Sequence, residues 1–255
     1  MKQRNFLRKL YRKFATTIFC FIAIFAISLI FCGCPANLKI IANSDKTFSL
    51  EFNSIFGEKL VCALEDLSQI SAQFSENAAI GDVQNQSQNF DLSQIIDTKK
   101  IEDELSAQHF SQSQVTIQRK SEKAYNFIAS AKIKNIARFP KECLSQEEML
   151  GGKKRVVFSL GAKSLRAALL HDESTLKTFA EILMSPLVTG EEMSAEEYED
   201  LLSEIYGKGV ANELLSGKFK VDFVCPNGKI LSQEIPIANL LASNETIVFV
   251  FVFEY

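Results

Sequence analysis

The chain opens with a basic segment followed by a long apolar segment, and this order constrains how everything after it can fold. Residues 1–14 carry six Lys and Arg side chains and no acid, whereas residues 15–31 carry no charge at all. These are the n-region and h-region of a bacterial export signal, in the usual order. Because basic residues are retained in the cytoplasm, the sequence predicts that the rest of the chain lies on the other side of the membrane.

The apolar segment ends in a short motif that predicts where the signal is cut. It reads Leu29-Ile30-Phe31-Cys32-Gly33-Cys34-Pro35 and resembles a relaxed form of the lipobox of bacterial lipoproteins. The resemblance implies that signal peptidase cleaves between Gly33 and Cys34, and that the Cys34 thiol carries diacylglycerol with fatty acids such as palmitate. It implies a signal peptide over 1–33, a lipidated N-terminus over 34–36 and a single domain over 37–255.

Two other outcomes stay open for this segment. The uncharged stretch from residue 15 to residue 35 has about the 20 residues that cross a bilayer, so it can remain as an uncleaved signal anchor. Ordinary cleavage and secretion is the third outcome. The first two outcomes leave the domain tethered to the cell envelope, outside the cytoplasm, in the periplasm or at the surface.

The charge of the exported part excludes one class of partner. Removing residues 1–33 leaves 22 Lys and Arg against 31 Asp and Glu, a net charge of −9. An acidic domain lacks the basic footprint that phosphate backbones require, so we expect no nucleic-acid partner. We also expect no electrostatic attraction to anionic lipid headgroups.

Alternating and helical apolar patterns predict the first half of the domain. Residues 38–52 have the pattern of a β-hairpin, followed by a helix over 55–73 with Leu60, Leu64, Leu67 and Ile70 on one face. Residues from about 74 to 113 are rich in Ser, Gln and Asn and predict a polar insertion with one short helix over 99–108. A second hairpin is expected over 115–131.

The second half continues the alternation of strands and helices. A strand is expected over 155–160, two short helices between 164 and 185, and a third helix that starts with the capping box of Ser194 and Glu197. Residues 219–225 and 246–253 predict strands. The last strand is apolar on both faces, which is typical of the centre of a covered sheet. The sequence thus predicts an α+β fold, with a mainly antiparallel sheet and helices packed on at least one face.

Neither the cysteines nor the glycines of the exported part form a recognisable catalytic or metal motif. Cys62, Cys143 and Cys225 match no metal-binding spacing. We interpret them as small buried hydrophobic residues, with a disulfide among them left open. The pair Gly151-Gly152 lacks the spacing of a phosphate-binding loop and predicts a turn before a strand.

Two histidines and one acidic cluster remain as candidates for chemistry. His109 lies in the polar insertion, and His171 precedes Asp172 and Glu173. Neighbouring residues on a helix do not face each other, so this trio favours helix capping and solvation. A cluster of acids lacks the pattern of a calcium loop and predicts a solvated helix start; its members are Glu191, Glu192, Glu196, Glu197, Glu199 and Asp200. We therefore expect no metal, no cofactor and no catalytic residue.

The exported part resembles the LppM-like bacterial lipoproteins. The resemblance rests on LKIIANSDKTFSLEF soon after Cys34, and on the strand and turn FKVDFVCPNGKI before a closing strand. It implies a small envelope lipoprotein domain with a cavity suited to a lipid or glycolipid, and it offers no catalytic residues to carry over. We therefore expect a non-catalytic binding or structural lipoprotein, with an apolar ligand or a protein partner. The alternative is an envelope enzyme in which His171 and acids meet in a cleft.

Overall fold

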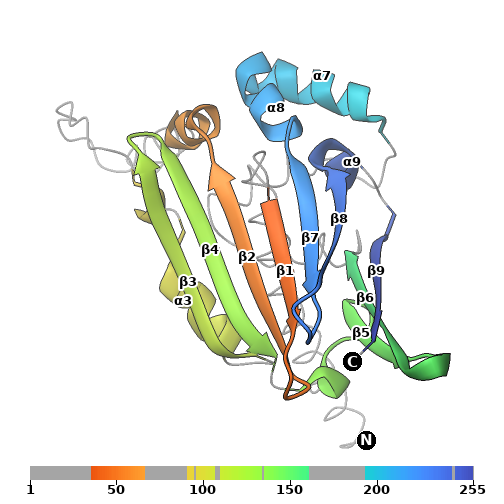
Figure 1. Cartoon of the computed structure of the whole chain (residues 1–255). Coiled ribbons are helices and arrows are strands. Elements are labelled where there is room, and N and C mark those ends of the chain that lie inside the picture. The colour runs from red at the N-terminus through yellow and green to blue at the C-terminus, as the bar shows by residue number, and fades with distance from the viewer. Residues whose placement is uncertain are drawn as a thin grey trace, which may run out of the picture.

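The structure is a computed structural model of the chain. It describes residues 36–66, 91–94, 96–106, 110–133, 135–160, 193–242 and 245–254. The predicted signal segment, Leu67, Ile70 and the two helices expected between 164 and 185 lie outside these ranges. Within them the chain has the predicted α+β fold, with mostly antiparallel sheets and helices packed against them (Figure 1).

The larger sheet has six strands in the order β3-β4-β2-β1-β7-β8. Its strands are β1 (Ala36–Ala42), β2 (Phe48–Phe56), β3 (Phe110–Ser121), β4 (Ala124–Ile133), β7 (Lys218–Val224) and β8 (Ile230–Pro236). All neighbours are antiparallel except β1 and β7, which run in the same direction. The first strand of the domain therefore lies inside the sheet, between β2 and β7.

The hairpins predicted from alternating residues are confirmed. Strands β1 and β2 pair with Ile40 opposite Leu50, and both side chains are buried on the same face. Strands β3 and β4 pair with Ile117 opposite Phe127. Each hairpin buries one face of its strands because side chains alternate between the two sides of a strand.

The smaller sheet has three strands, and it corrects the prediction for the C-terminal strand. Its order is β5 (Leu144–Glu148), β6 (Lys153–Leu160) and β9 (Ile247–Glu254), all antiparallel. We expected β9 at the centre of a covered sheet, but among the described strands it lies at the edge of the smaller sheet. Its phenylalanines face inward, whereas Val248 and Val252 are 49% and 44% exposed on the outer face.

The core lies between the two sheets, where phenylalanine rings from β7 and β9 meet. The Phe219 and Phe249 ring centroids are 5.7 Å apart in an edge-to-face arrangement, and those of Phe223 and Phe251 are 5.4 Å apart and stacked. Aromatic pairs at these spacings add specific contacts to the burial of apolar surface. These contacts hold β9 against the larger sheet although it belongs to the smaller one.

Helices cover one end of the sheets and one edge. Residues 58–66 are helical and bury Leu60 and Leu64, so the predicted helix is confirmed over these residues. Residues 55 and 56, which we expected in the helix, belong to β2 instead, and residues 67–73 lie outside the described ranges. The other helices are α3 (Thr98–Ser106), α7 (Ala195–Tyr206), α8 (Lys208–Leu215) and α9 (Ile237–Ala242). Figure 1 shows α7, α8 and α9 at the end of the larger sheet where β1 begins.

Three short 3-10 turns complete the described elements, at Leu92–Gln94, Ile136–Arg138 and Leu150–Gly152. In the last of them Gly151 and Gly152 have φ angles of +80° and +75°, a left-handed conformation that glycine adopts without strain. The predicted turn before β6 is thus confirmed. Helix α7 begins with both hydrogen bonds of the predicted capping box between Ser194 and Glu197.

The region assigned to the polar insertion is described only in part. Its residues 91–94, 96–106 and 110–113 include α3 and the start of β3, and they bury Leu92, Ile96 and Leu105. Strand β3 begins at Phe110, five residues before the first strand residue expected, Val115. The short helix predicted over 99–108 corresponds to α3, which packs against β3.

Candidate functional site

The predicted anchor site lies immediately before the first described strand. Gly33 and Cys34 are outside the described residues, and Cys34 precedes Ala36 by only two positions. Ala36 is buried and pairs with Ser54 on one side and Phe219 on the other. A tether at Cys34 therefore enters the domain at the end of an interior strand, with a single residue between the anchor and the sheet.

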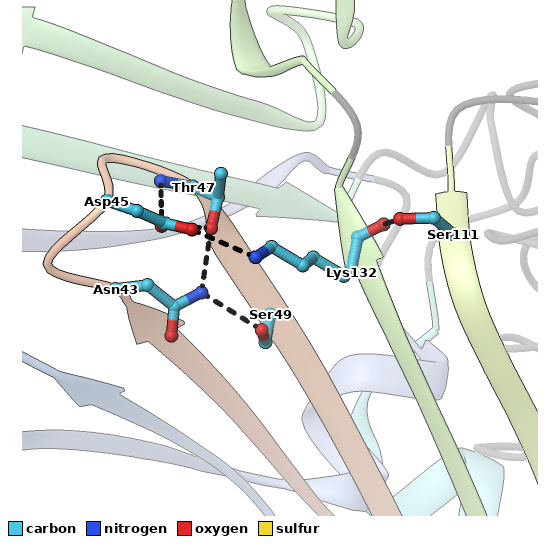
Figure 2. A network of polar contacts seen from close by, with 6 residues as sticks. All are labelled: Asn43, Asp45, Thr47, Ser49, Ser111 and Lys132. Carbon is cyan, nitrogen blue, oxygen red and sulfur yellow. Dashed lines mark hydrogen bonds and ion pairs between the residues drawn. The ribbon is translucent and has the colours of Figure 1, made fainter.

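At the opposite end of β1, a polar network fixes the β1–β2 turn (Figure 2). The Asn43 amide donates hydrogen bonds to Thr47 Oγ1 (3.0 Å) and Ser49 Oγ (3.1 Å). The Asp45 carboxylate accepts from the Thr47 backbone N–H (3.0 Å) and hydroxyl, and it pairs with Lys132 Nζ at 3.0 Å. Lys132 lies on β4, directly opposite Ser49 of β2, so the network joins the turn to the strand next to the β1–β2 hairpin.

The electrostatics of this turn favour a structural role over proton transfer. The hydrogen bond from the Thr47 hydroxyl, followed by that from Lys132, lowers the pKa of Asp45 to about 2. A carboxylate with this pKa remains ionised at physiological pH, whereas a general acid needs a pKa near the working pH. The sequence predicted the turn, but the contact with Lys132 joins residues 87 apart in the chain and has no local signal.

A second carboxylate, Asp222 on β7, is buried in a group of polar side chains. Its oxygens accept from Ser232 Oγ on β8, from Lys220 Nζ at 2.9 Å and from Asn37 Nδ2 at 3.1 Å. Burial alone would raise the pKa of Asp222, but the hydrogen bonds from Ser232, Lys220 and Asn37 outweigh it and lower the pKa. This group links β1, β7 and β8 and holds Asp222 ionised.

The three cysteines of the domain are free and differ in exposure. Cys143 and Cys225 are buried, as predicted, and burial raises the pKa of Cys143 to about 12. Cys62 is only half-buried, and its Sγ lies 3.4 Å from Lys123 Nζ. The hydrogen bond to Cys62 raises the pKa of Lys123, and the nearby negative charge of Glu65 adds a smaller effect in the same direction. The prediction that Cys62 is buried was wrong, because its side chain faces Lys123 in the exposed β3–β4 turn.

The remaining candidates for chemistry are placed only in part. His109, His171, Asp172, Glu191 and Glu192 lie outside the described residues. Within the described ranges, no group of three His, Cys, Asp or Glu side chains could hold a metal ion. The other four acids of the cluster lie on α7, with Glu196 and Glu197 in its first turn, where a negative charge favours the helix N-terminus as predicted.

Two long-range side-chain contacts had no sequence signal. The Gln233 side chain on β8 donates to the Val250 carbonyl of β9 at 2.8 Å and accepts from the Val250 N–H at 3.4 Å. It thereby connects the edge of the larger sheet with the edge of the smaller one. The Glu213 carboxylate on α8 accepts from two N–H groups at the start of helix 58–66.

Among the described residues, no helix is long and apolar enough to cross a membrane. Comparison with known proteins returned no match to a family model, to a curated protein or to a solved structure.

Proposed function

We propose that this chain is a membrane-anchored bacterial envelope lipoprotein of the LppM-like kind, tethered through acylated Cys34. The observation that carries the proposal is the order of residues 1–36: a basic segment, an uncharged apolar segment, Gly33-Cys34, and then a buried strand residue at Ala36. Cleavage and acylation require an accessible Cys34. Cys34 precedes the first described strand, so cleavage before it would leave every described strand in the mature chain.

We propose a binding or structural role for the domain, with an apolar or lipid ligand or a protein partner, and no catalysis. The carboxylates of Asp45 and Asp222 each accept several hydrogen bonds, which lower their pKa values and connect neighbouring strands. A group held ionised in this way is a poor proton donor at neutral pH. The side chains that meet between the two sheets are phenylalanines, which would suit an apolar ligand better than a polar one.

Fractionation of cells that express the full chain tests the tether. We expect the wild-type protein in the membrane fraction, resistant to extraction by high salt and released by detergent. Cys34→Ala removes the acylated thiol, and Cys32→Ala is the matched control because it removes a neighbouring thiol and leaves Gly33-Cys34 intact. The proposal requires that only Cys34→Ala changes processing; equal behaviour of both variants would contradict it.

A further inference from the structure

We propose that the end of the domain where β1 begins is its membrane-facing surface, with the phospholipid headgroup layer as its partner. The inference rests on the tether proposed above, and it holds for acylated Cys34 and for an uncleaved apolar segment alike. Two residues of fully extended chain span about 7 Å at most. Cys34 precedes Ala36 by two residues, so the anchor can lie no further than this from the sheet.

The chain cannot lengthen this tether by releasing the start of β1. Ala36 is buried and pairs with both Ser54 and Phe219, and Leu38 and Ile40 further along the strand are buried as well. Freeing the first residues of an interior strand would break its backbone hydrogen bonds to the strands on both sides and would expose buried apolar side chains to water. The sheet end that contains Ala36 is therefore held against the membrane.

The register defines which other elements share this end. Ser54 pairs with Phe127, so the end of β2, the start of β4 and the β3–β4 turn at residues 122–123 lie there. Helix 58–66 follows β2 directly, and its Lys59 side chain is 3.8 Å from the position that a Cβ on Gly209 of α8 would occupy. Figure 1 shows these elements gathered at one end of the larger sheet.

This end carries more acids than bases, so charge does not draw it toward a membrane. Helix α7 contributes five exposed acids and no base, namely Glu196, Glu197, Glu199, Asp200 and Glu204. The other exposed side chains at this end include Glu58, Lys59, Glu122, Lys123 and Lys208, and Lys123 pairs with Glu65 at 3.9 Å. An acidic surface gains no attraction from anionic headgroups, and salt screens the repulsion between them. The orientation is thus set by the short tether, and on a zwitterionic membrane it should not depend on ionic strength.

The opposite end faces away from the membrane. Strand β1 has seven residues, about 23 Å of extended chain, and it leads to the turn that contains Asp45. Strand β9 runs along β7, because Phe219 meets Phe249 and Phe223 meets Phe253. Lys153 pairs with Glu254, which places the β5–β6 hairpin tip at this far end, where Leu150 is 98% exposed.

Fluorescence quenching by lipids measures the orientation directly. Glu122→Cys and Leu150→Cys place one label in an exposed turn at each end, in a full-length Cys62→Ser background; the parent without an introduced cysteine sets the background signal. The proteins are reconstituted into vesicles of zwitterionic phosphatidylcholine that contain phosphatidylcholine with a nitroxide-labelled headgroup. We expect quenching at position 122 to exceed that at position 150 several-fold, equally at about 50 mM and about 500 mM salt.

The outcomes separate this inference from the proposed function. Protein that floats with the vesicles but shows equal quenching at both positions, or stronger quenching at position 150, overturns the orientation and leaves the tether intact. Protein that does not float with the vesicles overturns the tether and the orientation with it. Quenching that exceeds background only at position 122 supports both.

Discussion

The Glu213 carboxylate on α8 accepts a hydrogen bond of 2.9 Å from the backbone N–H of Leu60, which lies 153 residues earlier in the chain. It also accepts from the N–H of Lys59 at 3.1 Å. The first N–H groups of a helix have no hydrogen-bond partner within the helix. Here the distant Glu213 carboxylate accepts their hydrogen bonds, and its negative charge suits the helix N-terminus. Gly57 makes room for this contact, because a Cβ at this position would lie 2.5 Å from Glu213 Cδ.

Replacing Gly57 by Ala should displace the Glu213 carboxylate and destabilise the fold by about 1–3 kcal/mol, the usual cost of overpacking. Urea unfolding of purified protein measures this cost. Gly209→Ala is the matched control, since a Cβ there meets only Lys59 side-chain atoms at 3.8 Å. Because Gly209 lies inside α8, we expect this control to stabilise the fold by about 0.5–1 kcal/mol.

A double-mutant cycle tests whether Gly57 acts through Glu213. Removing the carboxylate with Glu213→Ala should cost about 1 kcal/mol, the usual effect of losing a helix cap. In that background Gly57→Ala should cost much less than in the wild type, because the clash has gone. Equal costs of Gly57→Ala in the two backgrounds would show that the close approach to Glu213 is not what requires glycine.

Gln233→Ala should loosen the edge of β9. The N–H and C=O of Val250 lose their side-chain partner, and we expect a cost of about 0.5–1.5 kcal/mol. Hydrogen exchange at the Val250 amide should accelerate, and the freed apolar edge should raise the tendency to aggregate. Gln118→Ala, the same truncation at an exposed position of edge strand β3, should change neither property.

The β1–β2 turn should give the fold a pH-dependent contribution at acidic pH. The pKa of Asp45 is lowered to about 2 from 3.8, so the fold favours the ionised carboxylate. The carboxylate stabilises the fold fully at pH values above the pKa of Asp45 in the unfolded chain. This stabilisation is lost as the pH falls through the pKa of Asp45 in the folded protein. At neutral pH the wild type should resist urea better than Asp45→Asn, and the difference should vanish below about pH 2. A difference that is constant across this range would contradict the assignment.

The cysteines should differ in reactivity in the folded protein. Cys62 is half-buried, whereas Cys143 is buried and its pKa is raised to about 12. The thiolate is the reactive form, so a thiol reagent at mildly alkaline pH should label Cys62 first. Peptide mapping after labelling reads the sites, and labelling in urea is the control that makes Cys143 accessible. Equal labelling of both in the folded protein would be the contrary result.

Local pattern was enough to predict the hairpins and the start of α7. Alternation in Phe48, Leu50 and Phe52 indicated which face of β2 is buried, because a strand exposes its two faces in turn. Likewise, Ser194 and Glu197 are close enough in sequence to form a capping box that can be recognised from residue type. These features depend on residues within a few positions of each other.

Sheet order and contacts between distant elements could not be predicted in this way. Strand β9 is apolar on both faces, which indicated a central position, yet phenylalanine packing on β7 fixes only its inner face. Its outer valines lie at the edge of the smaller sheet, where the Gln233 side chain of the larger sheet donates a hydrogen bond to the Val250 carbonyl. The turn network is similar, since the pattern around Asp45 predicted a turn but not its ion pair with Lys132.

The intact mass of the protein purified from the membranes of a native-type bacterial host tests the central claim most directly. Acylation of Cys34 predicts a mass that lacks residues 1–33 and includes acyl chains, with both changes absent in Cys34→Ala. A full-length mass without acylation would mean an uncleaved anchor, and it would contradict the assignment of Cys34 as a lipidated N-terminus.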